Sequence, residues 1–209
     1  MTTEDSEVSF RSKKLAPVLW KSGCLDFGEF TLTSGITSPY YVDLRLLPSY
    51  SELFDIATDM AADLVRKEEL AFDVVSAVPT GGLPFGTLLA HKLGAPLTYV
   101  RKQGKSHGEE RQVEGKMEKG DRALVVDDII TTGGSVIDAV RSVRENGGIV
   151  DDVLVLLDRT EGGSENLREE GLMLNKVGNI KPLVEELESR GKIDSEMLSK
   201  VKKYLEERC

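Results

Sequence analysis

The chain has 209 residues, of which 36 are acidic and 27 are basic, giving a formal net charge of −9. This balance argues against a nucleic-acid binder, and the apolar runs are too short to span a membrane. Residues 1–7 are polar and acidic, unlike a secretory signal, and Cys24 and Cys209 show no metal-binding spacing, so we expect a cytoplasmic protein. The length suffices for one α/β domain with a full core.

Strands and helices are expected to alternate along most of the chain. Apolar runs and helical spacing predict these elements in chain order: a helix over 13–22, a loop-and-strand segment over 27–45, a helix over 50–65, a strand over 72–78, a helix over 84–93, strands over 96–100 and 123–126, a helix over 136–143 and a strand over 153–157. The alternation predicts right-handed βαβ units and a parallel sheet, whose ligands bind beyond the carboxyl ends of the strands. We therefore expect the loops after residues 78, 100, 126 and 157 to meet at one site.

The end of the chain differs in character, with two charged, amphipathic helices expected over 180–190 and 195–207. The second helix carries one apolar stripe, formed by Met197, Leu198, Val201 and Leu205. Such a stripe typically packs on a core or at a dimer surface, so we assign no chemistry to these helices.

Residues 123–136 read ALVVDDIITTGGSV and carry the strongest functional signal. A short β-branched run ends at Asp127 and Asp128, and a hydroxyl- and glycine-rich turn over 131–135 leads into a helix. Such a turn presents free backbone N–H groups and the positive end of a helix dipole, which together bind phosphate. The carboxylates lie too close to a bound phosphate to be its ligands, so they must serve a cation or hydroxyl groups. The alternative is an ordinary strand-to-helix turn with Ser135 as its N-cap.

Two further loops follow predicted strands. Residues 79–82, Pro-Thr-Gly-Gly, form a second small-residue turn before a helix and, taken alone, fit an ordinary tight turn. Residues 101–108 hold one Arg, two Lys and one His, and the stretch up to Gly115 is almost without apolar side chains. We expect a mobile loop that closes over substrate, with Gly104, Gly108 and Gly115 as hinges; the alternative is a solvated run of charges.

Aromatic side chains and an arginine complete the candidate site. The segment 27–45 contains Tyr40 and Tyr41, which are able to stack on a planar ring or to belong to the core of a hairpin. Arg159 follows the strand over 153–157, where a guanidinium facing a ligand grips a carboxylate through two parallel hydrogen bonds. A surface ion pair is the alternative reading of Arg159.

The stretch 123–136 resembles the 5-phosphoribosyl-1-diphosphate (PRPP) motif of the type I phosphoribosyltransferases. The pattern Arg-Lys-x-x-Lys-x-His over 101–107 resembles the catalytic loop of the orotate-specific members, and the resemblance runs in collinear order over residues 20–165. It implies an α/β, type I phosphoribosyltransferase fold, with a central, mainly parallel sheet flanked by helices, an N-terminal hood segment and C-terminal helices. Residues 1–174 then form the phosphoribosyltransferase domain with its hood, and residues 175–209 a C-terminal helical extension packed on it.

The resemblance implies a transferase that converts orotate and PRPP to orotidine 5′-monophosphate and pyrophosphate, in UMP biosynthesis. The resemblance implies catalytic roles for Lys105, His107, Asp127 and Asp128. It implies that PRPP is contacted by Arg101, Lys102, Lys105, His107, Asp127, Asp128, Ile129, Ile130, Thr131, Thr132, Gly133, Gly134, Ser135, Thr80 and Gly81. It implies that orotate is contacted by Thr131, Arg159, Tyr40 and Tyr41.

Family members use Mg²⁺ held through the substrate, without a firm protein ligand, and work as homodimers in which the mobile loop reaches the neighbouring site. Arg101 or Lys102 would then act in trans. The sequence departs from some relatives, which have lysines where this chain has Thr33 and Gly81. Two alternative functions are that of a purine or uracil phosphoribosyltransferase and that of a PRPP-sensing regulator on the same fold. The Lys/His loop over 101–107 and Arg159 argue against the first alternative. The intact loop and the acidic charge of the chain argue against the second, and no nucleic-acid or membrane partner is expected.

Overall fold

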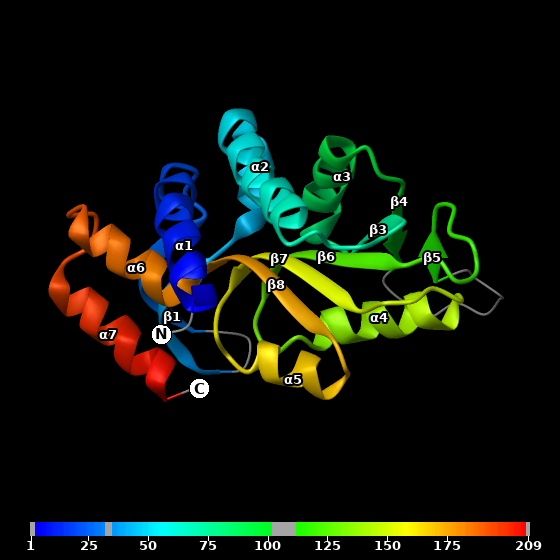
Figure 1. Ribbon diagram of the computed structural model, residues 1–209. Helices are drawn as coiled ribbons and strands as arrows, with labels where there is room; N and C mark the ends of the chain where they lie inside the picture. Colours follow the sequence, from blue (N-terminus) through cyan, green and yellow to red (C-terminus); the bar gives the residue numbers. More distant parts are fainter. Residues whose placement is uncertain (1–2, 32–34, 102–111, 208–209) are drawn as a thin grey trace.

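The computed structural model describes residues 3–31, 35–101 and 112–207 (Figure 1). The side chains are described from residue 5 onwards. Several sequence-based assignments lie outside the described residues, namely Thr33, Lys102, Gly104, Lys105, His107, Gly108 and Cys209.

The centre of the molecule is a six-stranded sheet with the order β5-β4-β3-β6-β7-β8. Its strands are β3 (Val74–Ala77), β4 (Leu97–Val100), β5 (Val113–Glu114), β6 (Ala123–Ile130), β7 (Asp152–Asp158) and β8 (Met173–Asn179). Neighbouring strands are parallel except β4 and β5. The predicted α/β class with a mainly parallel sheet is therefore confirmed.

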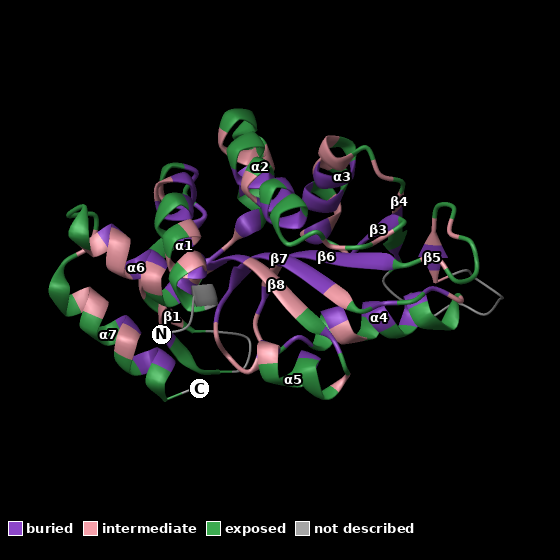
Figure 2. Cartoon of the chain, viewed as in Figure 1, coloured by how far each residue is buried: buried purple, intermediate pink, exposed green. Residues whose placement is uncertain are grey.

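Helices cover both faces of this sheet (Figure 1). On one face lie α1 (Thr3–Lys21), α2 (Ser51–Lys67) and α3 (Gly82–Leu93); on the other lie α4 (Gly134–Glu145) and α5 (Gly163–Glu169). The central strands are buried along most of their length (Figure 2), because parallel strands with helices on both sides contact no water. Among the described residues, no helix is long and apolar enough to cross a membrane.

A smaller unit sits beside one end of the sheet. Strands β1 (Leu25–Thr31) and β2 (Thr37–Val42) form an antiparallel pair, followed by the 3₁₀ helix η1 (Leu44–Ser49). Helices α6 (Ile180–Ser189) and α7 (Ser195–Glu206) end the chain, with α6 against α1 and α7 against both α6 and β2. Asn179 and Asp194 cap these two helices with their side chains.

The structure extends or corrects several predicted elements. Strand β6 continues through both acids to Ile130, because the backbone from Asp127 onwards still pairs with β7. Helix α4 begins at Gly134 with Gly133 as its N-cap, so Ser135 lies in the first turn and is not the cap. Helix α5 and strand β8 were not predicted. Strand β8 contains Asn175 and Lys176 and therefore lacks the apolar run of a buried strand, a composition that the edge of a sheet tolerates.

Candidate active site

Two loops at the carboxyl ends of neighbouring strands enclose a cavity of about 360 Å³. It is lined by Pro79, Thr80, Gly81, Asp127, Asp128, Ile129, Ile130, Thr131, Thr132, Gly133, Gly134, Ser135 and Val136. The loop between β3 and α3 therefore meets the loop between β6 and α4, as parallel topology predicts. The PRPP-motif residues and the second small-residue turn share one site.

Both helices that follow these loops begin at the cavity. Helix α4 starts at Gly134, and the first-turn residues Gly134, Ser135 and Val136 line the cavity, whereas α3 reaches it with its N-cap, Gly81. Gly133 adopts φ 84°, the left-handed region that glycine enters without steric cost. The positive dipole end of α4 and the adjacent backbone amides make this cavity suitable for a phosphate group.

Helix α5 supports the second of these loops from behind. Asn166 donates a hydrogen bond from Nδ2 to the carbonyl oxygen of Thr132 at 2.8 Å. A Cβ added to Gly163 would lie 2.6 Å from the carbonyl oxygen of Thr131, so the helix packs directly on the loop backbone. The sequence did not point to Asn166, since nothing in the pattern around it marks a ligand or a loop contact.

The two adjacent acids are buried side by side at the floor of the cavity. The Asp127 carboxylate accepts the backbone N–H of Asp128 at 2.9 Å, and the Asp128 carboxylate accepts that of Ile129 at 3.0 Å. Burial, reinforced by the charge of Asp128, raises the pKa of Asp127 well above its usual range. Burial also raises the pKa of Asp128, and the positive charge of Arg45 opposes this shift. The pair is therefore poised to receive hydroxyl groups or a cation, which would compensate its charge.

Gly81, which stands where some relatives have a lysine, lies directly against the side chain of Asp128. A Cβ added to Gly81 would lie 2.1 Å from Oδ2 of Asp128, and one added to Gly82 would lie 2.8 Å from Oδ1 of Asp127. The carboxylates thus occupy the space next to the first loop. A lysine at position 81 would therefore require Asp128 to move.

Arg159 directly follows β7 and points into a buried polar cluster. Its Nη2 lies 2.8 Å from Oε1 of Glu161, and its Nε donates to the hydroxyl of Tyr40 at 3.3 Å. Its guanidinium also lies over the Tyr40 ring, 5.0 Å from the centroid. Burial raises the pKa of Tyr40 to about 12, with the charge of Arg159 acting in the opposite direction, so this phenol stays protonated.

The structure separates the two candidate tyrosines. Tyr40 is fully buried against Arg159, whereas Tyr41 is 39% exposed and packs on Phe30 with ring centroids 5.7 Å apart. Successive residues of a strand point to opposite faces, so both rings cannot stack on one ligand.

A second cavity of about 450 Å³ adjoins the first and shares Thr132 with it. Its lining is Ile36, Thr37, Thr132, Glu161, Tyr204 and Glu207. Sequence reasoning missed Glu161, although an acid two residues after a candidate carboxylate-binding arginine was a usable signal. It also missed Tyr204, which lies beside the recognised apolar stripe of α7.

Arg101 directly follows β4 and lines a third cavity of about 500 Å³. This cavity shares Pro79 and Ser135 with the cavity of about 360 Å³ that contains Asp127 and Asp128. The guanidinium of Arg101 lies 3.3 Å from Oε1 of Glu114. The loops after β3 and β6 therefore meet at one cavity, as predicted, and Arg101 after β4 and Glu161 after β7 line cavities that share residues with it. Convergence of the rest of the loop after β4 stays a prediction, because residues 102–111 lie outside the described structure.

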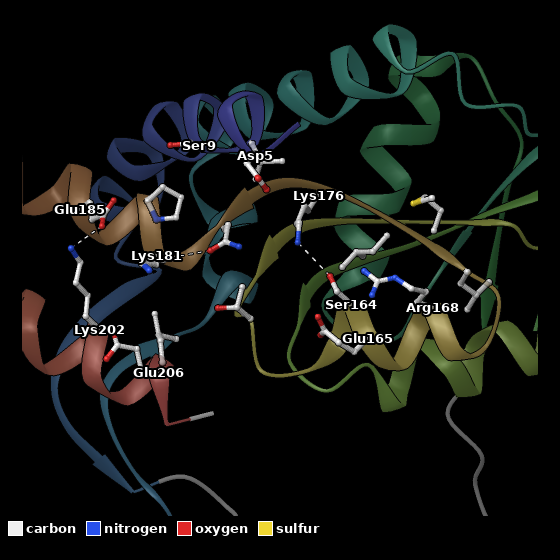
Figure 3. A pocket seen from close by; sticks show the side chains of 18 residues that line it. Asp5, Ser9, Ser164, Glu165, Arg168, Lys176, Lys181, Glu185, Lys202 and Glu206 are labelled. Atoms are coloured by element: carbon white, nitrogen blue, oxygen red, sulfur yellow. Dashed lines mark hydrogen bonds and ion pairs between the residues drawn. The ribbon is translucent and has the colours of Figure 1, made fainter. Parts of the chain in front are cut away.

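A larger cavity of about 890 Å³ shares no lining residue with these three and lies between α1, α5, β8 and the C-terminal helices (Figure 3). Four basic and four acidic side chains line it. Lys176 is paired with Asp158 at 2.6 Å and Lys202 with Glu185 at 2.8 Å. This balanced charge offers no preference for an anion or a cation, so the smaller cavities are the better candidate site.

Comparisons with known proteins agree with this geometry. Residues 49–168 match the phosphoribosyl transferase domain family. The chain is 42% identical over 189 residues to the orotate phosphoribosyltransferase of Pyrobaculum aerophilum, covering 90% of this chain and 96% of that protein.

Two solved structures extend the match. The orotate phosphoribosyltransferase from Aeropyrum pernix has a TM-score of 0.73 at 39% identity, covering 83% of this chain and 98% of that one. Leishmania donovani UMP synthase has a TM-score of 0.86 at 30% identity, covering 95% of this chain and 43% of that one. With the two-loop phosphate cradle inside the matched region, the chain belongs to the orotate phosphoribosyltransferases of the phosphoribosyl transferase domain family.

Proposed function

We propose that the protein transfers the 5-phosphoribosyl group of PRPP to N1 of orotate, giving orotidine 5′-monophosphate and pyrophosphate. One observation carries this proposal: a phosphate cradle with two acids at its floor adjoins, through Thr132, a cavity next to a buried arginine. The cradle suits PRPP and the arginine suits the carboxylate of orotate. Family membership supports the same reaction.

In this proposal the loop over 131–135 holds the 5′-phosphate through its backbone N–H groups. Asp127 and Asp128 receive the ribose 2′- and 3′-hydroxyls, which replace the hydrogen bonds that the buried carboxylates would otherwise take from water. Thr80, Gly81 and Arg101 contact the pyrophosphate. The same role is proposed for Lys102, Lys105 and His107, which lie outside the described residues. Backbone contacts of Ile129 and Ile130 complete the cradle.

Arg159 is the group proposed to grip the orotate carboxylate with its planar fork, with Thr131 at the near edge of the base. Of the two tyrosines, Tyr40 is in contact with that arginine, and the contact of Tyr41 with orotate stays a prediction. Glu161 already lies on the guanidinium, so the incoming carboxylate must compete with it or bind to its free edge.

The chemistry needs no protein nucleophile. N1 of orotate attacks the anomeric carbon as the bond to pyrophosphate breaks, through a transition state with positive charge on the ribose ring. The residues of the site contribute by positioning both substrates and by stabilising the charge that develops on the leaving group. The buried carboxylates also favour positive charge on the adjacent ring.

Mg²⁺ fits this donor set when most of its ligands come from substrate oxygens. Among the described residues, no group of three or more His, Cys, Asp and Glu side chains is placed to hold a metal ion. Asp127 and Asp128 are the carboxylates proposed to face it. Bound there, the ion would neutralise the diphosphate and orient the ribose hydroxyls.

A homodimer with shared sites is part of the proposal. Leu46, Tyr50 and Ile56 are 44%, 47% and 48% exposed along η1 and α2, and exposed apolar side chains of this size suit a contact between subunits. The cytoplasm as the location, and residues 175–209 as an extension, stay predictions.

Complementation between subunits tests the shared site. An inactive Lys105→Ala subunit mixed with an inactive Asp127→Asn/Asp128→Asn subunit should regain activity, because one site of the heterodimer then combines an intact loop with intact acids. Alone, Lys105→Ala should lower kcat by about 10²–10³, the usual range for a group that stabilises transition-state charge. Mixtures that stay inactive despite proven subunit exchange would show that the loop serves its own subunit.

The reaction itself is tested by the loss of orotate absorbance on addition of PRPP and Mg²⁺. Activity should require all three components and should stop when the metal is chelated. PRPP that binds stoichiometrically without any turnover of orotate would instead indicate a PRPP-sensing protein.

A further inference from the structure

We propose that α7 is a wall of the orotate pocket, and that Tyr204 is a positioning residue that holds Tyr40 and, through it, the carboxylate-binding Arg159. The inference rests on the proposed function and adds a residue from the C-terminal helices to its substrate-recognition machinery.

Three side chains from distant parts of the chain form a stack. Tyr204 meets Tyr40 edge to face, with ring centroids 5.8 Å apart and planes at 89°. Tyr40 also contacts Arg159, both through its hydroxyl and across its ring. Tyr40 is fully buried and Tyr204 is 7% exposed, so the stack is enclosed. The Tyr40 ring therefore fixes one face and the Nε edge of the Arg159 guanidinium, while Glu161 holds Nη2.

The last turn of α7 separates two cavities. Tyr204 and Glu207 line the cavity that contains Thr132 and Glu161, next to the phosphate cradle. Leu205 and Glu206 line the larger cavity on the other side of the helix, where Figure 3 shows Lys202 and Glu206. Consecutive residues of one turn therefore face different spaces, and the Tyr204 side is the one that reaches the base.

This arrangement has a specific energetic consequence. A guanidinium binds a carboxylate through two parallel hydrogen bonds only when its plane is held in the correct orientation. An edge-to-face contact favours one orientation of the partner ring, so Tyr204 fixes Tyr40, which in turn fixes the guanidinium. The phosphate cradle has its own support in Asn166 and does not depend on this stack.

The test compares Tyr204→Ala, Tyr204→Phe and Leu205→Ala in the full-length protein. Tyr204→Ala should raise the orotate KM by about tenfold, the scale of losing one aromatic contact with its packing. The PRPP KM should stay within about twofold of the parent value and kcat within about threefold. Tyr204→Phe keeps the ring edge and should behave like the parent. Leu205→Ala removes a buried side chain from the same turn, on the other face, and should leave the orotate KM unchanged.

Thermal unfolding establishes that each variant is folded under the assay conditions. A folded Tyr204→Ala protein with an orotate KM within about twofold of the parent value overturns the inference, and so does an equal rise in KM for Leu205→Ala. A rise in both KM values for Tyr204→Ala also overturns it, because that outcome indicates general loosening of the fold. A parent protein without orotate turnover overturns the proposed function itself, which distinguishes the two failures.

Discussion

The proposed phosphate side and the proposed base side of this site are built in different ways. The proposed phosphate side comes from two short segments, 79–81 and 127–136, in which a strand, a glycine turn and a helix start fix the backbone N–H groups. The proposed base side is assembled from Tyr40, Arg159 and Tyr204, which lie on β2, on the loop after β7 and on α7. One side is encoded locally, whereas the other exists only after the chain has folded.

This difference predicts how each side fails. A substitution in a local cradle should remove PRPP binding and leave the base side intact. A substitution in the composite pocket should weaken orotate binding in steps, because several side chains share the task.

Gly133→Val should abolish PRPP binding while the protein stays folded. The added Cβ would find space, with its nearest neighbour Ile130 Cδ1 at 3.5 Å, but φ is 84°, which a β-branched residue strongly disfavours. Calorimetric titration with PRPP measures the effect. Gly94→Val is the matched control, because Gly94 is also left-handed, with φ 65°, has open space for a side chain, and ends α3 away from the cradle. If Gly133→Val binds PRPP like the parent, the phosphate sits elsewhere.

Arg159→Lys should weaken orotate binding by roughly 2–5 kcal/mol. The planar guanidinium donates two parallel hydrogen bonds to a carboxylate, whereas the lysine ammonium is a point charge that leaves one carboxylate oxygen without its hydrogen bond. PRPP affinity should change little, since Arg159 reaches the cradle only through its backbone N–H on Ile130. Orotate binding to the two proteins gives the answer. An orotate Kd within twofold of the parent value would remove Arg159 from the site.

Gly81→Ala tests the contact between the two phosphate loops. The added methyl group would lie 2.1 Å from Oδ2 of Asp128, so we expect a loss of about 1–3 kcal/mol in the free energy of unfolding, as for other overpacked sites, together with lower activity. Urea denaturation measures the loss. In an Asp128→Gly background the same change should cost almost nothing. An equal cost in both backgrounds would refute the proposed steric origin.

Asp127→Asn should inactivate the enzyme yet stabilise the free protein at pH 8, by about 1–3 kcal/mol, the scale of burying an uncompensated polar group. Burial raises the folded-state pKa of Asp127, so the folded protein holds this proton more tightly than the unfolded chain. Stability of the parent therefore falls as the pH rises from the unfolded pKa, about 3.9, to the folded one. The advantage of Asn should shrink toward pH 4. A variant no more stable than the parent at pH 8 would contradict this account.

The same contrast explains what could be predicted from the sequence. A phosphate-binding role for residues 123–136 and 79–82 could be predicted from the sequence, because in each segment a strand, small residues and a helix start are contiguous. The parallel topology of the sheet then brings the two loops together. Tyr204 could not be identified in this way, and the only signal for Glu161 was its position two residues after Arg159. The contact of Arg159 with Tyr40 spans 119 positions, and Tyr204 enters through packing of α7 on β2, which no local pattern records. Strand β8 was missed for a related reason, because its polar residues are acceptable only at a sheet edge.

Base competition tests the central claim most directly. The protein would be given PRPP, Mg²⁺ and an equimolar mixture of orotate, uracil, hypoxanthine and adenine, and the nucleotides formed would be separated and quantified. A pocket built around Arg159 should produce orotidine 5′-monophosphate almost exclusively, because only orotate carries a carboxylate. Comparable amounts of a uracil or purine nucleotide would contradict the account. So would the absence of any nucleotide product when the PRPP is shown to be intact.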